Sequence, residues 1–185
     1  MTCIVGIVHE GEIFMGGDSA GVGGMSITNR VDEKVFRNGP YLIGYTSSFR
    51  MGQLLRYHLK VAKRDPDVSA MEHMVTAFIP AVRQCFFEGG YTWKSEDMEF
   101  LVGYEGHLFH IENDFQVGEA RTGYDACGCG ADIALGALHA MRWSNFSLGK
   151  VHPQNQIEMA LAAAAEFSAG VRGPWTVMTS KAGAA

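Results

Sequence analysis

The residues with the clearest chemical potential lie within the first 35 positions: Thr2, Asp18 and Lys34, spaced sixteen residues apart. If Met1 is removed, Thr2 becomes the first residue and carries two reactive groups. Its hydroxyl can attack a carbonyl carbon, and its α-amine, with an ordinary pKa of ~8, can take the proton. A lysine beside an aspartate stays charged and can lower the pKa of a neighbouring hydroxyl or amine. These residue types therefore indicate nucleophilic attack on a carbonyl group.

A first hairpin is predicted to bring Asp18 back to Thr2. Residues 3–8 are almost continuously apolar, which is typical of a strand buried on both faces. A turn centred on residues 10–11 pairs residues whose numbers sum to 21. Asp18 then lies opposite Cys3, so the carboxylate returns beside the hydroxyl of Thr2.

A second hairpin is predicted to place Lys34 in the same region. Residues 38–40, Asn-Gly-Pro, separate strand-like stretches at 35–37 and 41–45. An Asn-Gly pair between such stretches is a strong hairpin signal. The resulting pairing brings Lys34 near Gly44.

The remaining chain predicts helices and strands in separate groups. Helices are expected at about 48–64, from 69 to at least 85, at 131–141 and at 154–167. Pro80 should kink or split the second of these helices. Strands are expected at 98–104, 107–112 and 175–178. The Gly-rich segment 21–24 is interpreted as a mobile loop, 91–97 as a polar connection and 180–185 as a frayed tail. Because helices and strands are segregated, the order predicts an α+β fold.

Composition limits the class of protein. A chain of 185 residues is expected to form one domain, 1–185, with a substantial core. The apolar fraction of 47% and the charged fraction of 19% are those of a soluble globular protein. A net charge of −5 without a basic cluster argues against nucleic-acid binding, and no apolar run is long enough to span a membrane. Since no signal-peptide pattern is present, we expect a cytoplasmic chain whose four cysteines are free thiols.

Neither a metal nor a cofactor is predicted. His107 and His110, taken with Cys127 and Cys129, suggest a metal site, but their spacing matches no common zinc pattern. The glycines at 21–24 lack the Lys and the Ser or Thr of a phosphate-binding loop at the required spacing. We therefore interpret the histidines as ordinary strand or surface residues.

Taken together, these patterns resemble the proteasome β-subunits and the bacterial peptidase subunit HslV, which are N-terminal-nucleophile (Ntn) hydrolases. The spacing of Thr2, Asp18 and Lys34 carries most of the resemblance. Weaker similarities to the family's strand-to-helix turn, central hairpin, turn before the third helix and Tyr-Ser-Gly-Gly turn lie at 43–48, 99–114, 128–131 and 167–170. The resemblance implies a four-layer αββα sandwich.

The resemblance also implies a role for each of the early residues. Thr2 would be the nucleophile and its amine the base. Lys34, held by Asp18, would stabilise the developing negative charge. Gly44 matches the glycine whose backbone N–H helps to form the oxyanion hole.

Several positions depart from the family pattern. Ser47 and Ser48 stand where HslV-like chains have a pair of glycines, and each serine adds a Cβ. Cys129 stands where the family has a serine that hydrogen-bonds the terminal amine, and a thiol is a poorer partner. Ala165 falls where many proteasome subunits have an aspartate. Ser168 matches the serine of the later turn and completes the predicted site.

The predicted function is a threonine peptidase that cleaves unfolded polypeptides inside a homo-oligomeric ring. The resemblance leaves open an ATP-dependent unfoldase as a partner. Two alternatives remain: a non-catalytic structural subunit, which Cys129 and Ala165 favour, and a small-molecule amidase of the same superfamily. Cys3 is not expected to be the nucleophile, because Thr2 would also have to be removed.

Overall fold

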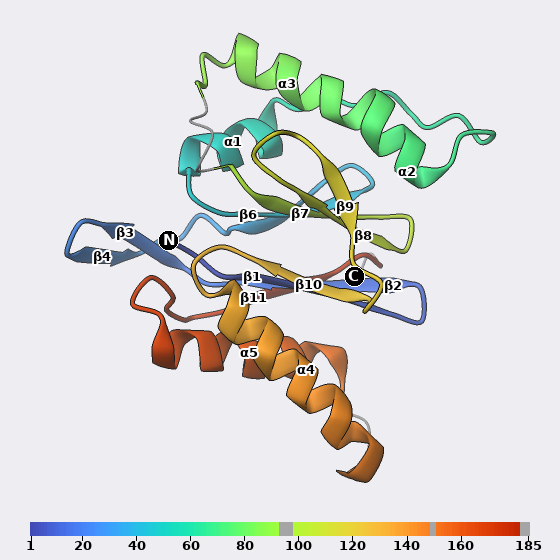
Figure 1. Cartoon of the computed structure of the whole chain (residues 1–185). Helices are drawn as coiled ribbons and strands as arrows, with labels where there is room; N and C mark the ends of the chain where they lie inside the picture. Colours follow the sequence, from blue (N-terminus) through green and yellow to red (C-terminus); the bar gives the residue numbers. More distant parts are fainter. Residues whose placement is uncertain (93–97, 149–150, 182–185) are drawn as a thin grey trace.

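The computed structural model describes residues 1–92, 98–148 and 151–181. Within these ranges, antiparallel sheets lie one on the other and helices cover their outer faces (Figure 1). The chain therefore has the mixed helix-and-strand composition that the sequence predicted. Most of the expected polar connection, 93–97, and the end of the expected tail, 182–185, lie outside the described residues.

The first sheet has the strand order β10-β1-β2-β11, with antiparallel pairing throughout. Its strands are β1 (Ile4–His9), β2 (Glu12–Gly17), β10 (Tyr124–Cys127) and β11 (Thr176–Thr179). β1 pairs with β2 in the register Ile4↔Gly17, so the predicted sum of 21 is confirmed. The turn residues Glu10 and Gly11 have φ values of 52° and 76°, as a primed hairpin turn requires.

The second sheet has the strand order β5-β6-β7-β8-β9, again antiparallel. Its strands are β5 (Val35–Asn38), β6 (Tyr41–Tyr45), β7 (Phe100–Tyr104), β8 (His107–Ile111) and β9 (Val117–Glu119). The predicted second hairpin is confirmed, because Val35 pairs with Gly44 and Tyr45 N–H donates to Lys34 O at 3.1 Å. The hairpin predicted over 98–112 is confirmed as β7–β8.

Helix α1 (Phe49–Tyr57) begins at its predicted N-cap but ends earlier than predicted. Ser48 Oγ accepts a first-turn N–H at 3.2 Å. The expected continuation to residue 64 is wrong. Asn38 Nδ2, from the end of β5, donates to the carbonyl of Leu55 at 2.7 Å. A side chain from the sheet thus satisfies a carbonyl that another helical turn would have used.

The second predicted helix continues past Pro80 instead of breaking there. It consists of α2 (Ala70–His73), the π-helical segment η1 (Met74–Phe78) and α3 (Ile79–Glu88), which follow one another directly. The wider π turn lies just before the proline, whose missing N–H removes one helical hydrogen bond. A π turn also shifts the helix face that meets the sheet. Met71 and Val75 are accordingly 37% and 50% exposed, while Met74 and Phe78 are buried.

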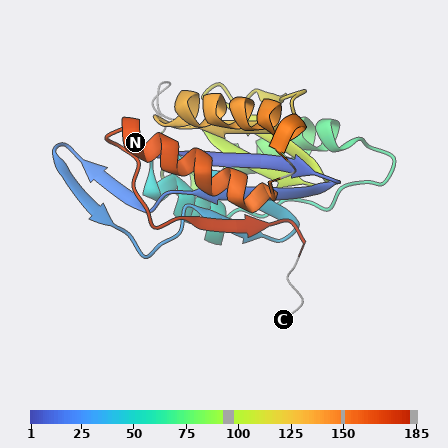
Figure 2. The ribbon, with the colours of Figure 1, turned by 90° about the horizontal axis from the view of Figure 1, so that it is seen from below.

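The segment 21–24 is part of a hairpin, so its interpretation as a mobile loop is wrong. Strand β3 (Ala20–Gly23) pairs with β4 (Ser26–Asn29) in a separate small sheet. Figure 2 shows this hairpin extending away from the stacked sheets. Glycines carry little strand propensity, and the pairing is made by backbone groups, so the side chains gave no signal for it. Strands β9 and β10 were likewise not predicted.

Buried apolar side chains hold the helices against the sheets. Helix α4 (Ala131–Leu148) continues beyond its expected end at 141, and α5 (Pro153–Phe167) begins one residue before its predicted start. The contacts of α4 and α5 with the first sheet include Val5, Phe14, Leu138, Ile157 and Leu161. Those of α1 and α3 with the second sheet include Leu54, Phe78, Phe86 and Phe100. Between the sheets lie Ile4, Ile13, Met15, Val35, Leu42, Leu101, Leu108 and Cys127.

The substitution Gly44→Ala tests the close approach of the two sheets. A Cβ at Gly44 would lie 2.5 Å from Ile4 Cγ2 and 2.7 Å from Met15 Sδ. We expect the free energy of unfolding to fall by about 1–3 kcal/mol, because both side chains must move. Gly23→Ala is the matched control, since no atom lies within 4 Å of a Cβ built there. Urea denaturation measures the effect, and equal stability of the two variants would contradict it.

Candidate active site

The side chain of Lys34 joins Thr2 to Asp18. Its Nζ donates hydrogen bonds to Thr2 Oγ1 (2.9 Å), Asp18 Oδ1 (2.9 Å) and Ala20 O (2.6 Å). An ammonium group has three N–H donors, and each has an acceptor here. Thr2, Asp18 and Lys34 are each only 2% exposed. The three residues that the sequence analysis brought together therefore form one buried cluster.

Asp18 is oriented by the backbone on both sides of it. Its Oδ1 also accepts from Cys3 N–H at 3.0 Å, and its Oδ2 accepts from Ala20 N–H at 3.0 Å. Asp18 N–H in turn donates to Cys3 O at 3.3 Å. This arrangement follows from the β1–β2 register, because Asp18 is the first residue beyond β2 and faces Cys3. The carboxylate is thus buried with its acceptor sites occupied, which a buried charge requires.

Burial and charge act in opposite directions on this cluster. Burial lowers the pKa of the Lys34 ammonium, while the charge and hydrogen bond of Asp18 raise it, and the net shift is downward. The pKa of the neighbouring Cys3 thiol is raised to about 12, mainly by burial and then by the charge of Asp18. A thiol that stays protonated is a poor nucleophile. Cys3 therefore does not compete with Thr2.

The loop between β10 and α4 fixes the backbone of Thr2. Thr2 N–H donates to Cys129 Sγ at 3.3 Å, and Gly130 N–H donates to Thr2 O at 3.3 Å. Gly128 has a φ of 94°, and a Cβ there would lie 2.4 Å from Thr2 O, so only glycine fits. Cys129 Sγ lies 3.4 Å from Ser168 Oγ, at the end of α5. The structure thus places the predicted residues Cys129 and Ser168 beside Thr2.

Met1 covers the Thr2 end of the cluster. With Met1 attached, Thr2 N is a peptide nitrogen and cannot act as a base. Thr2 Oγ1 donates to Met1 O, so the hydroxyl also has a partner that exists only while Met1 is present. A Cβ on Gly170 would lie 2.5 Å from Met1 Cβ and 2.7 Å from Cys129 Sγ. Removal of Met1 would therefore open space next to Thr2 and Cys129.

Gly44 is not brought to this cluster. It is the residue before the last in β6, between Val35 of β5 and Leu101 of β7. A Cβ built on Gly44 would point toward Ile4 and Met15 in the space between the sheets. The glycine is needed there because the sheets approach closely.

Ser47, which the sequence analysis treated only as a departure, lies two residues beyond the end of β6. Its φ of 64° is unusual for a residue with a side chain, and such strain is often found at functional sites. Thr46 anchors it by donating to Glu99 O from N–H (3.2 Å) and from Oγ1 (2.9 Å). A Cβ on Gly128 would lie close to both Thr46 Cγ2 and Thr2 O, so this loop faces Thr2. Within the described residues, Ser47 N–H has no hydrogen-bond acceptor.

The site contains backbone groups that residue types alone could not reveal. Ala20 contributes both its N–H, which donates to Asp18, and its carbonyl, which accepts from Lys34. In the described part of the chain, no group of three or more His, Cys, Asp or Glu side chains is arranged to hold a metal ion. No helix in that part is long and apolar enough to cross a membrane.

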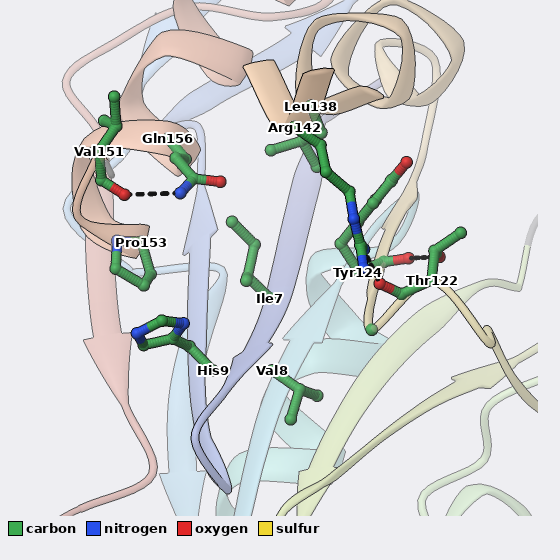
Figure 3. Close-up of a pocket in the computed structure, with 11 residues that line it drawn as sticks. Ile7, Val8, His9, Thr122, Tyr124, Leu138, Arg142, Val151, Pro153 and Gln156 are labelled. Atoms are coloured by element: carbon green, nitrogen blue, oxygen red, sulfur yellow. Dashed lines mark hydrogen bonds between the residues drawn. The ribbon is translucent and has the colours of Figure 1, made fainter. Parts of the chain in front are cut away.

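A pocket of about 380 Å³ lies at the other end of β1 from Thr2 (Figure 3). Its lining includes Ile7 of β1, Tyr124 of β10, Leu138 and Arg142 of α4, and Gln156 of α5. The Gln156 amide donates to Val151 O at 2.6 Å. Because the lining contains neither Thr2, Asp18 nor Lys34, the pocket is separate from the cluster.

Comparisons with known proteins identify the fold. No protein-family model matches the sequence, and no curated protein matches it. BPH from Thiobacillus denitrificans, solved alone and in complex with epoxomicin, has a TM-score of 0.79 to this chain at 19% identity, covering 96% of this chain and 97% of BPH. HslV from Trypanosoma brucei has a TM-score of 0.67 at 16% identity, covering 96% of this chain and 98% of HslV.

The chain therefore has a proteasome-subunit-like, HslV-like fold, and the predicted resemblance is confirmed at that level. At these identities the likeness concerns the fold and carries no residue roles. The arrangement of Thr2, Asp18 and Lys34 is an independent observation on this chain.

The substitution Lys34→Met tests whether the buried cation is needed for stability. We expect it to lower the free energy of unfolding by about 3–5 kcal/mol, because it leaves the Asp18 carboxylate buried without its ammonium partner. Lys181→Met is the matched control, since Lys181 is 74% exposed beside Glu12 and such surface pairs contribute about 0–1 kcal/mol. Urea unfolding followed by circular dichroism measures both, and similar losses would contradict the assignment.

Proposed function

We propose that this chain is a threonine-type peptidase subunit of the Ntn-hydrolase superfamily, with Thr2 as the nucleophile. The observation that carries the proposal is the position of Lys34 Nζ, 2.9 Å from both Thr2 Oγ1 and Asp18 Oδ1. A buried ammonium at this distance stabilises a hydroxyl oxygen that loses its proton. The HslV-like fold supports the same class of reaction.

The proposed reaction begins after Met1 has been removed. The Thr2 amine accepts the hydroxyl proton while Oγ1 attacks the carbonyl carbon of the peptide bond. Lys34 stabilises the negative charge that develops on Oγ1, and Asp18 keeps the ammonium charged and oriented. The protonated amine then gives its proton to the leaving amine. Water hydrolyses the resulting Thr2 ester and frees Thr2 for another cycle.

The oxygen of the tetrahedral intermediate needs a hydrogen-bond donor of its own. We assign this role to Ser47 N–H in place of Gly44, because Ser47 follows β6, has a free N–H and lies in the loop that faces Thr2. Cys129 Sγ, 3.3 Å from Thr2 N, and the nearby Ser168 would orient the terminal amine.

The proposal extends to the architecture and the assembly. Residues 1–185 would form one domain, a four-layer αββα sandwich, as helices on both outer faces of stacked sheets suggest. Copies of the chain would form a cytoplasmic ring around unfolded polypeptide substrates. The charged fraction of only 19% and the HslV-like fold support such a ring. An ATP-dependent unfoldase is the proposed partner of such a ring.

The thiol of Cys129 at 3.3 Å from Thr2 N favours a second candidate, a non-catalytic structural subunit. A chain that keeps Met1 has no free Thr2 amine, and Cys129 offers that amine a weaker partner than serine would. A small-molecule amidase of the same superfamily is the third candidate. Polypeptide and small-amide substrates distinguish these functions.

Hydrolysis of a fluorescently labelled unfolded polypeptide should cease in Thr2→Ala, since the attacking hydroxyl is lost. Thr2→Ser should retain part of the activity, because serine supplies the same two groups. Thr76→Ala is the matched control, as Thr76 Oγ1 contacts only Glu72 O on an exposed helix turn. Intact mass should show that Met1 is absent from active chains. Epoxomicin, which BPH binds, should inhibit the wild type.

Each contrary result identifies a different error. Undiminished hydrolysis by a folded Thr2→Ala variant rejects Thr2 as the nucleophile. Activity in a preparation whose chains all retain Met1 rules out the terminal amine as the base. A wild type that lacks Met1 and hydrolyses neither polypeptides nor small amides is a structural subunit, and one that hydrolyses only small amides is an amidase.

Size-exclusion chromatography with light scattering should give a mass several times the 20.2 kDa of one chain. We expect this because the proposed peptidase encloses its substrate in a ring of identical subunits. The mass should stay constant on dilution through the micromolar range. A monomer at every concentration would contradict the ring.

A further inference from the structure

A second cluster of charged side chains lies behind the loops that frame the proposed site. His110, on β8, is held between two carboxylates, with Nε2 2.9 Å from Glu99 Oε1 and Nδ1 3.1 Å from Asp125 Oδ2. Burial alone would lower the pKa of His110, but the hydrogen bonds and charges of Asp125 and Glu99 raise it to about 9. The imidazole is therefore protonated at neutral pH. The proposed reaction does not use this group.

Glu99 connects this cluster to both loops of the proposed site. Its Oε2 accepts a hydrogen bond from Gly128 N–H at 3.0 Å, directly before Cys129. Its carbonyl accepts from Thr46 N–H (3.2 Å) and Oγ1 (2.9 Å), directly before Ser47. One residue thus holds the loop that orients the Thr2 amine and the loop that presents the proposed oxyanion donor.

The position of the Gly128 loop matters because Thr2 has little room to move. Gly130 N–H donates to Thr2 O, and Gly128 lies so close to that carbonyl that a Cβ would meet it at 2.4 Å. A shift of this loop would carry the Thr2 backbone with it. Catalysis is sensitive to displacements of this kind, since a misplacement of about 1 Å can cost about a hundredfold in rate.

We propose that Glu99, held by protonated His110, is a positioning residue that clamps the Gly128–Cys129 loop to the Thr46–Ser47 loop. The clamp itself is argued from hydrogen bonds of this chain, and only its effect on turnover rests on the proposed function. His110 supplies the charge that keeps the Glu99 carboxylate ionised and pointed at Gly128. Asp125 holds the other nitrogen of the ring and fixes its orientation.

The clamp has a defined pH range. The charged groups facing His110 are Glu99 and Asp125, and the Cys127 thiol faces Glu99 with its pKa raised by burial, so it stays neutral. The hydrogen bond from His110 lowers the pKa of Glu99. Because the folded pKa of His110, about 9, exceeds its ordinary value of 6.5, its contribution is complete below pH 6.5 and is lost as the pH rises through about 9.

The test compares two His–Glu pairs whose histidines lie on the same strand, β8. Glu99→Ala, Glu99→Gln and His110→Gln alter the clamp. Glu119→Ala and His107→Gln are the matched controls, because His107 lies 2.9 Å from Glu119 in an exposed pair at the other end of β8. All variants are made in the full chain and compared after Met1 removal has been checked by mass.

The first measurement is amide hydrogen exchange resolved at Gly128 and Thr46. Glu99→Ala and His110→Gln should accelerate exchange at Gly128 about tenfold, because a hydrogen bond to a charged acceptor is lost or weakened. Glu99→Gln should accelerate exchange less than Glu99→Ala, since its amide oxygen can still accept from Gly128 N–H, although without the charge. The control variants should leave both amides unchanged, and wild-type protection at Gly128 should fall above about pH 9.

The second measurement is hydrolysis of the labelled polypeptide. In Glu99→Ala and His110→Gln, kcat should fall about tenfold to a hundredfold while KM changes by less than about twofold, because reacting groups are misplaced and substrate contacts remain. Glu99→Gln should lose less kcat than Glu99→Ala, because it keeps an acceptor for Gly128 N–H. The controls should match the wild type.

Unchanged exchange at Gly128 in Glu99→Ala overturns the clamp, whether or not the protein hydrolyses anything. If Glu99→Ala does not fold, the same result in His110→Gln is decisive. Faster exchange with unchanged kcat overturns the positioning role. A wild type without Met1 that is inactive refutes the proposed function and with it the effect on turnover, while the exchange data still decide the clamp.

Discussion

The buried ammonium of Lys34 is the interaction on which the rest of the site depends. A charge removed from water is tolerated only if it is paired and its hydrogen bonds are satisfied. Its acceptors come from separate segments: Thr2 before β1, Asp18 after β2, and Ala20 at the start of β3. The native position of each segment is therefore tied to the others, and the geometry useful for chemistry is also the geometry that satisfies the charge.

The stacked sheets supply the frame for this cluster. Thr2, Asp18 and Lys34 lie just before β1, just after β2 and just before β5. Buried apolar side chains pack these strands against one another between the two sheets. Gly44, the residue before the last in β6, lets the sheets approach closely. The separation between the strand ends is then set by core packing, which is stiff because protein interiors are close-packed.

Two loops complete the site with backbone groups. The Gly128 loop holds Thr2 by its carbonyl, and the Ser47 loop presents an N–H in a left-handed conformation. Glu99 connects them through its carbonyl and its carboxylate, and the charge of His110 lies directly behind it.

The sequence by itself determined the parts that depend on neighbours along the chain. Two short hairpins, with their turn residues and apolar strands, set the register that brings Asp18 and Lys34 to Thr2, and both registers are confirmed. The HslV-like fold could be predicted because these hairpins carry the family's spacing. The start of α1 at Ser48 was also predictable, because an N-cap depends on a serine side chain and the N–H groups of the next few residues.

Only the tertiary structure decided the features made by residues far apart. Asn38 ends α1, β10 pairs with β1 across the chain, and His110 meets Glu99 and Asp125. The left-handed conformation of Ser47 after β6 likewise has no counterpart in the residue pattern. Such contacts leave no periodicity or spacing in the sequence, because each is set by the packing of whole sheets and not by adjacent residues.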